Sequence, residues 1–184
     1  MSSVQEQLRW LPITPIITEC VTDMCLVKEA YQYGNDTSPD PSTKNGAILT
    51  DKHGQTLAYS ANRFARGLAE TQSRLNDRKI KYQMVVHAEN GAVFNAARHG
   101  INTKGTVLYC PFYACAECAK AIIQSGIKKV VGHAQMMILA SSHTQWVEAV
   151  MMGWSMLHEA GVSCVLFDGV IDVTARFNYE DVNL

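Results

Sequence analysis

The motifs His87-Ala-Glu89 and Cys115-Ala-Glu-Cys118 place the strongest constraint on how this chain folds. Each motif falls where a helix is predicted to begin, and cysteines three residues apart on a helix share a face. Cysteine and histidine are ligands of tetrahedral zinc, and a three-ligand set leaves the fourth position for water, as in catalytic zinc sites. The fold must therefore bring two helix starts, 28 residues apart in sequence, to one metal ion.

Glu89 lies two residues after the histidine and is placed to contact the water rather than the metal. Zinc lowers the pKa of its bound water from about 15.7 to about 7, so hydroxide is available at neutral pH. A carboxylate beside that water can accept its proton and return it to a ring nitrogen and a leaving amine. The pattern matches the signature of zinc-dependent nucleobase deaminases. It predicts a Zn²⁺ cofactor held by His87, Cys115 and Cys118, with Glu89 as the catalytic residue.

The hydrophobic pattern predicts alternating strands and helices, which argues for an α/β sheet covered by helices. Helices are predicted at 13–33, 87–99, 115–125 and 143–160, and strands at 46–50, 56–60, 106–110, 128–131 and 162–167. The polar segment 62–82 is expected to be an extended loop or a short helical insertion. With 184 residues and no linker or repeat, we expect a single domain over 1–184 with a catalytic core at about 40–167.

Composition excludes several classes of protein. The chain is 47% apolar and 18% charged, which is typical of a globular protein, and its net charge of −1 gives no general attraction to nucleic acid or membranes. No apolar stretch approaches the ~18 residues of a membrane span, and residues 1–18 lack a signal-peptide pattern. We therefore expect a cytoplasmic protein with reduced thiols. Four cysteines are expected to be core residues rather than ligands: Cys20, Cys25, Cys110 and Cys164.

From about residue 40 to residue 132 the sequence resembles the deoxycytidylate (dCMP) deaminases of the cytidine deaminase-like superfamily. Four segments carry the likeness, of which the last is the most specific: Asp40-Pro-Ser-Thr-Lys-Asn-Gly-Ala47, Asn62-Arg-Phe-Ala-Arg-Gly67, His87-Ala-Glu89 and Cys115–Ile127. The resemblance implies a three-layer α-β-α fold with a central mixed sheet of about five strands. It also implies a hydrolase acting on a cyclic amidine, converting dCMP to dUMP and ammonia by zinc-hydroxide attack at C4.

The same resemblance implies roles for residues outside the metal motifs. Asn62 would bind the sugar hydroxyl, and the backbone N–H of Ala88 would hold the pyrimidine edge. Three further residues are candidates near the 5′-phosphate: Ser42, Lys44 and Arg66. The expected partners are a small-molecule nucleotide and further copies of the chain in a homo-oligomer. Four residues of the last helix are assigned either to such an interface or to the core: Met151, Met152, Trp154 and Met156.

The sequence departs from the family pattern at several positions. Ala114 replaces the usual proline before the first zinc cysteine, and Gly91 replaces a frequent asparagine. Ala61 and Arg63 replace the tyrosine and glycine that flank the loop asparagine, and Ala65 replaces the loop proline. None of these is a predicted metal ligand or proton carrier, so deamination is still expected. The base preference stays open, and a modified cytosine nucleotide, or a nucleotide in a different phosphate state, is an alternative substrate.

Two other functions are compatible with the motifs. A deaminase acting on a base in tRNA would use the basic segment 63–81 as its footprint, although the net charge and the lack of an aromatic and basic stripe argue against nucleic acid as a partner. A non-catalytic zinc module would need a fourth protein ligand, for which Cys110 or His99 could serve. Glu89 would then be only a helix N-terminal acid. The match around Asn62 argues against such a module.

Overall fold

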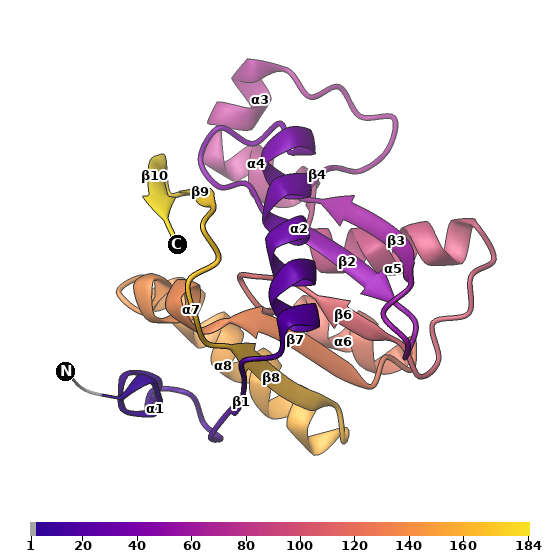
Figure 1. Ribbon diagram of the computed structural model, residues 1–184. Coiled ribbons are helices and arrows are strands. Elements are labelled where there is room, and N and C mark those ends of the chain that lie inside the picture. The colour runs from indigo at the N-terminus through magenta and orange to yellow at the C-terminus, as the bar shows by residue number, and fades with distance from the viewer. Residues whose placement is uncertain (1–2) are drawn as a thin grey trace.

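The structure of the protein, a computed structural model, describes residues 3–184 apart from the side chain of Gln145. Its centre is a six-stranded sheet with the order β1-β8-β7-β6-β2-β3 (Figure 1). Four neighbouring strands are parallel: β1 (Ile16–Thr18), β8 (Ser163–Phe167), β7 (Lys129–His133) and β6 (Val107–Tyr109). Strands β2 (Gly46–Thr50) and β3 (Thr56–Ala61) complete the sheet in antiparallel orientation. The predicted mixed α/β sheet is confirmed, with one strand more than the five expected.

Helices cover both faces of this sheet and give the three layers that were predicted. Helix α2 (Val21–Thr37) lies on one face, and α5 (Ala88–Arg98), α6 (Ala116–Gln124) and α8 (Thr144–Glu159) lie on the other (Figure 1). The shorter elements are α1 (Val4–Gln7), β4 (Arg63–Phe64), α3 (Gln72–Asn76), α4 (Arg78–Met84), β5 (Val85–Val86), α7 (Ala134–Ala140), β9 (Thr174–Phe177) and β10 (Glu180–Asn183).

The buried strands alternate their side chains between two hydrophobic clusters, as the period of two along a strand requires. One cluster lies against α5, α6 and α8, and the other lies against α2. The first takes Leu49, Leu108, Val130 and Leu166, and the second takes Ile48, Tyr109, Val131 and Val165. Because both faces are covered, the central strands are mostly apolar, and β6 leads from this core into the loop before the cysteine motif.

The predicted first helix at 13–33 is wrong at its start, because the helix begins at Val21 and Ile16–Thr18 form strand β1. Pro15 cannot donate a backbone hydrogen bond inside a helix, and the strand is stabilised instead by parallel pairing with β8. The prediction that Cys20 and Cys25 are core residues is also wrong, since both are exposed. Cys110 and Cys164 are buried, as expected.

The later predictions agree with the structure to within a few residues. The helices predicted at 87–99, 115–125 and 143–160 are α5, α6 and α8. Within α8, Trp154 is fully buried in the core whereas Met152 is 58% exposed, so the oligomer remains a prediction. The segment 62–82 contains β4 and the short helices α3 and α4, which fits the helical insertion. No helix within residues 3–184 has the length and apolarity needed to cross a membrane.

Candidate active site

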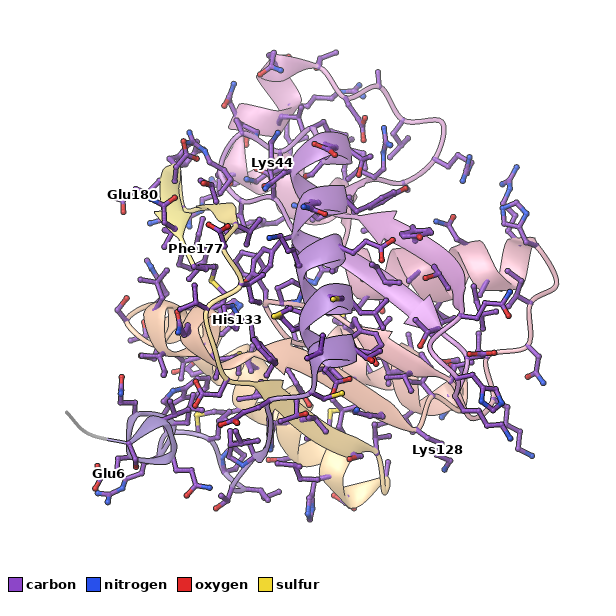
Figure 2. The ribbon with its side chains drawn as sticks, viewed as in Figure 1. Glu6, Lys44, Lys128, His133, Phe177 and Glu180 are labelled. Carbon is purple, nitrogen blue, oxygen red and sulfur yellow. The ribbon has the colours of Figure 1, made fainter. Side chains whose placement is uncertain are left out.

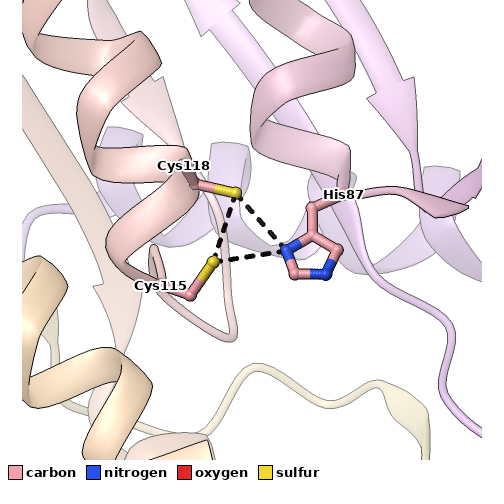
Figure 3. A group of neighbouring side chains, drawn as sticks. All are labelled: His87, Cys115 and Cys118. Carbon is pink, nitrogen blue, oxygen red and sulfur yellow. Dashed lines mark hydrogen bonds between the residues drawn. The ribbon is translucent and has the colours of Figure 1, made fainter. Parts of the chain in front are cut away.

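The predicted metal ligands meet at the starts of two helices on the same face of the sheet. His87 is the N-cap residue of α5 and Cys115 is the N-cap residue of α6, with Cys118 in the first turn of α6. Figure 3 shows the three side chains pointing toward one another. His87 Nδ1 lies 3.4 Å from each of the two Sγ atoms, and the Sγ atoms lie 3.7 Å apart.

These distances fit one zinc ion. Tetrahedral zinc with bonds of about 2.3 Å to sulfur and about 2.0 Å to nitrogen separates two sulfurs by about 3.8 Å and sulfur from nitrogen by about 3.5 Å. The observed triangle agrees with these spacings to within about 0.1 Å. The donor set of one imidazole and two thiols is also one that zinc prefers. His87, Cys115 and Cys118 can therefore hold the ion without rearrangement.

Hydrogen bonds couple the protonation of the three ligands. Hydrogen bonds from Cys118 and His87 lower the pKa of Cys115 to about 4, and the hydrogen bond with Cys115 raises the pKa of His87 to about 9. The hydrogen bond with Cys115 and burial raise the pKa of the Cys118 thiol. Because metal ligands must be deprotonated, zinc binding would release protons from this group of side chains.

The loop before Cys115 is fixed by a buried aromatic pair. Tyr113 has a φ of 64°, a left-handed conformation that is costly for a residue other than glycine. Its ring is buried and packs on Trp154 of α8 with ring centroids 4.4 Å apart. This packing offsets the backbone strain and turns the chain sharply from β6 into α6. Cys115, two residues after Tyr113, is the N-cap residue of α6.

Glu89 lies beside the metal triangle in the first turn of α5 and is only 2% exposed. Its Oε2 atom is buried and has no hydrogen-bond partner among the described residues. Burial raises the pKa of this carboxyl, although the charge of His87 opposes that rise. A buried carboxyl with one oxygen unpaired costs free energy unless a ligand or water completes it. The position is that expected for a group that moves protons to and from a substrate.

No fourth histidine, cysteine, aspartate or glutamate joins the three ligands within the described part of the chain. Cys110, one of the two candidates, is buried with its Sγ 3.3 Å from Asn45 Nδ2, and burial raises the pKa of its thiol. His99, the other candidate, is the C-cap residue of α5, at the opposite end of that helix from His87. The donor set therefore has the three-ligand form of a catalytic zinc site.

A pocket of about 640 Å³ opens onto this cluster. That volume is in the range of small-molecule sites. At the metal end it is lined by His87, Ala88, Glu89 and Cys115. Aromatic residues form much of the remaining wall: Tyr82, Phe112, Tyr113, Trp146 and Phe177. The last of these lies beyond residue 167, where the catalytic core was predicted to end, and that boundary remains a prediction.

Asn62 and Ala88 line the pocket as the predicted substrate contacts. Ala88 is the first residue of α5, where backbone N–H groups have no acceptor within the helix. The Asn62 side chain is already engaged: Oδ1 accepts from Ser38 Oγ at 2.7 Å and from Asn45 N at 2.8 Å, while Nδ2 donates to Thr43 O at 2.8 Å. Asn62 therefore fixes the loop beside the pocket and keeps one N–H free for a ligand.

Two of the three predicted phosphate contacts lie away from this pocket. Lys44 donates from Nζ to Asn35 O on helix α2 at 2.9 Å, and Figure 2 shows it beside that helix. Arg66 is exposed and reaches Asn95 Oδ1 on α5 at 3.4 Å. Neither side chain lines the pocket, so the pocket gives these two predictions no support. Sequence position alone does not show which side of a loop faces the site.

Ser42 does line the pocket, together with a lysine whose role the sequence did not reveal. Lys81 is 6% exposed and its Nζ lies 3.0 Å from Asp40 Oδ1 and 2.6 Å from Ser42 Oγ. Asp40 also accepts hydrogen bonds from Ser42 N and Oγ. The exposed Arg78 lies one helical turn earlier and lines the same pocket. The only signal in the sequence was the basic character of segment 63–81.

Comparison with known proteins agrees with the site. Residues 21–134 match the family described as cytidine and deoxycytidylate deaminase zinc-binding region. An Aliivibrio fischeri protein described as "Uncharacterized deaminase in luxG 3'region" is 33% identical over 125 residues, covering 68% of this chain and 80% of that protein. Human deoxycytidylate deaminase is 31% identical over 99 residues, covering 51% and 54%. The chain spans about half the length of the animal deoxycytidylate deaminases it matches.

Solved structures show the same fold. The apo crystal structure of dCMP deaminase from the cyanophage S-TIM5 has a TM-score of 0.57 and 23% identity, covering 80% of this chain and 96% of that one. The complex of the cyanophage protein with dCMP and dUMP gives a TM-score of 0.56 at 22% identity, covering 79% and 94%. The predicted cytidine deaminase-like fold is thereby confirmed.

Proposed function

Because this chain belongs to the cytidine and deoxycytidylate deaminase zinc-binding family, we propose that it is a zinc-dependent hydrolase that converts dCMP to dUMP and ammonia. The observation that carries the proposal is the position of Glu89. Its unpaired carboxylate oxygen is buried beside three metal ligands, at the end of a pocket large enough for a mononucleotide. In a purely structural zinc site, a buried carboxylate with an unpaired oxygen would cost free energy without a compensating role.

The chemistry divides between the metal and the chain. Zinc, when bound by His87, Cys115 and Cys118, supplies Lewis-acid activation of water. Glu89 accepts a proton from the attacking water as the C4–O bond forms, and delivers it to ring nitrogen N3. Glu89 then takes the proton of the new C4 hydroxyl and passes it to the leaving amine, so that the C4 carbonyl forms as the C4–N bond breaks and ammonia departs. The backbone N–H of Ala88 can hold the pyrimidine edge while these steps occur.

We assign the phosphate end of the nucleotide to Lys81, Arg78 and Ser42. Lys81 donates to Asp40 and Ser42, which leaves one of its three ammonium donors for a ligand. Arg78 is exposed at the same pocket and offers a planar guanidinium suited to phosphate oxygens. Two positive side chains at one pocket favour a nucleoside monophosphate over an uncharged nucleoside.

The tRNA alternative gains no support from the basic segment. Arg63 is paired with Glu70 at 2.7 Å, and Lys81 is buried against Asp40. The Arg63 side chain is exposed but paired with a carboxylate, and the Lys81 side chain is buried, so neither presents an unpaired positive charge at the surface to a polynucleotide. A mononucleotide, with its small anionic group near Lys81 and Arg78, fits the distribution of charge better.

Ammonia release by the zinc-loaded protein tests the proposal, with dCMP and deoxycytidine as parallel substrates. Glu89→Gln should keep zinc and fold but lose about 10²–10⁴-fold or more in activity, since one group carries several proton transfers. Glu117→Gln is the matched control, because it makes the same change in the first turn of α6, where the side chain is exposed. Activity of Glu89→Gln within about tenfold of the parent would show that Glu89 is not the proton carrier.

A further inference from the structure

The chain beyond β8 returns to the pocket and ends in a hairpin. Strands β9 and β10 pair antiparallel, and the two residues between them, Asn178 and Tyr179, have φ values of 50° and 68°. Left-handed conformations at both positions are those of a tight two-residue hairpin turn. In Figure 1 this yellow segment runs from β8 past helix α2 to the hairpin. It lies outside residues 21–134, which the family match covers.

Hydrogen bonds fasten the hairpin to the loop that carries Ser42. The contacts come from both backbones and from one arginine: Lys44 N to Arg176 O at 3.0 Å, Tyr179 N to Ser42 O at 2.8 Å, Asn178 N to Thr43 Oγ1 at 3.1 Å and Arg176 Nε to Pro41 O at 3.1 Å. At the start of the segment, the buried His133 bonds through Nε2 to Gly169 O at 3.1 Å. The hairpin is thus a fixed part of the pocket wall.

The residue that the hairpin brings to the pocket is Phe177. Its ring centroid lies 5.5 Å from that of Phe112 and 5.0 Å from that of His143, which it meets edge-on. All three residues line the pocket. Phe112 is three residues before the metal ligand Cys115, so this aromatic wall adjoins the metal end of the site. Figure 2 shows Phe177 on the hairpin, on the side nearer α2.

We propose that the C-terminal hairpin is a substrate-binding element of this enzyme, and that Phe177 contacts the nucleoside part of the bound nucleotide through its ring. The half-buried ring remains available to a ligand from the pocket side, although it already packs on Phe112. Aromatic rings bind bases by stacking, which leaves the hydrogen-bonding groups of the bases free. Phe177 would therefore contribute to binding and not to the proton transfers, which Glu89 performs. This inference rests on the proposed function for the identity of the substrate.

Steady-state kinetics with dCMP test the role of Phe177. Phe177→Ala is expected to raise KM by about tenfold or more while kcat stays within about threefold, because stacking acts before the chemical step. Phe177→Tyr should retain the parental KM, and Phe177→Leu keeps the packing volume for folding but should also raise KM. Val182→Ala is the matched control, since Val182 is in the same hairpin and packs on the same core cluster but does not line the pocket.

Titration of each variant with dUMP, followed by calorimetry, gives a readout that needs no turnover. If the parent is active, a KM for dCMP that rises in Phe177→Ala and stays unchanged in Val182→Ala supports the inference. Activity with equal KM in the parent, Phe177→Ala and Phe177→Leu overturns it and leaves the proposed function standing. An inactive parent whose dUMP affinity still falls in Phe177→Ala overturns the proposed function alone. An inactive parent without such a difference overturns both.

Discussion

Substituting Gly153 tests how the core of the protein sets the position of the first cysteine ligand. Gly153 lies in α8, directly against the chain that leads into α6. A Cβ built at this position would lie 2.8 Å from the carbonyl carbon of Cys115 and closer still to Ala114 O. Both neighbours are backbone atoms, so a flexible side chain cannot move aside to relieve the contact. Gly153→Ala must displace either α8 or the Cys115 segment.

The size of the displacement follows from the distances. Moving the Cys115 carbonyl carbon from 2.8 Å to an ordinary 3.4 Å requires about 0.6 Å, and relieving the closer contact with Ala114 O requires more, whereas metal–ligand distances tolerate about 0.2 Å. Overpacking of this kind typically costs about 1–3 kcal/mol, against a helix-propensity gain of about 0.5–1 kcal/mol for alanine over glycine. If the Cys115 segment yields, most of that cost falls on the zinc-bound form. Zinc affinity is then expected to fall by about 5- to 140-fold.

Chelator competition measures the zinc affinity, and urea denaturation of zinc-loaded and metal-free protein measures the two stabilities. Met152→Ala is the control, since Met152 neighbours Gly153 on α8 but is 58% exposed. We expect Gly153→Ala to destabilise the zinc-loaded protein more than the metal-free protein. Equal destabilisation of both forms with unchanged zinc affinity would show that α8 moves and that the ligand segment does not depend on it.

Four further predictions concern charge and metal. Arg78→Met should raise KM for dCMP by about tenfold and leave KM for deoxycytidine within about twofold. Lys81→Met should lower the free energy of unfolding in urea by about 3–5 kcal/mol, because the buried Asp40 carboxylate would lose its positively charged partner. Burial lowers the pKa of His133 from 6.5 to about 4. The contribution of the neutral imidazole to stability is complete above pH 6.5 and should be lost as pH falls through 4, so the free energy of unfolding should decline by about 3 kcal/mol over that range. In a His133→Gln variant the free energy of unfolding should depend less on pH over the same range. Chelation of zinc should lower Tm, and added zinc should restore it; a Tm indifferent to zinc would contradict coupling of the site to folding.

Local signals account for what the sequence predicted correctly. The cysteines of the second motif are spaced to share a helix face, both motifs lie at helix starts, and a buried strand precedes the second motif, so their meeting point could be inferred without knowing the sheet order. The structure brings His87, Cys115 and Cys118 together as that information predicted. Glu89 followed from its spacing to a ligand.

Contacts between distant segments account for what the sequence did not predict. Ile16 and Ile17 suit a helical face as well as a strand, and only their pairing with β8 selects the strand. Lys81 contributes to the pocket because it pairs with Asp40, 41 residues earlier, and nothing local marks it among its basic neighbours. Phe177 reaches the pocket through a hairpin whose register no sequence motif near the metal site encodes.

One departure from the family pattern, Gly91, has a packing reason. Gly91 faces β3, and a Cβ there would lie 2.9 Å from Ser60 Cβ and closer still to Ser60 Oγ, so a larger residue would push α5 off the sheet and carry His87 and Glu89 with it. Among the residues that line the pocket, none is one of the five replaced family positions. Base preference therefore depends on side chains that do line it. Phe112 adjoins the metal end, and its partner Phe177 comes from outside the segment in which the family resemblance lies, so selection for a modified or an unmodified cytosine should respond to these rings and not to Gly91.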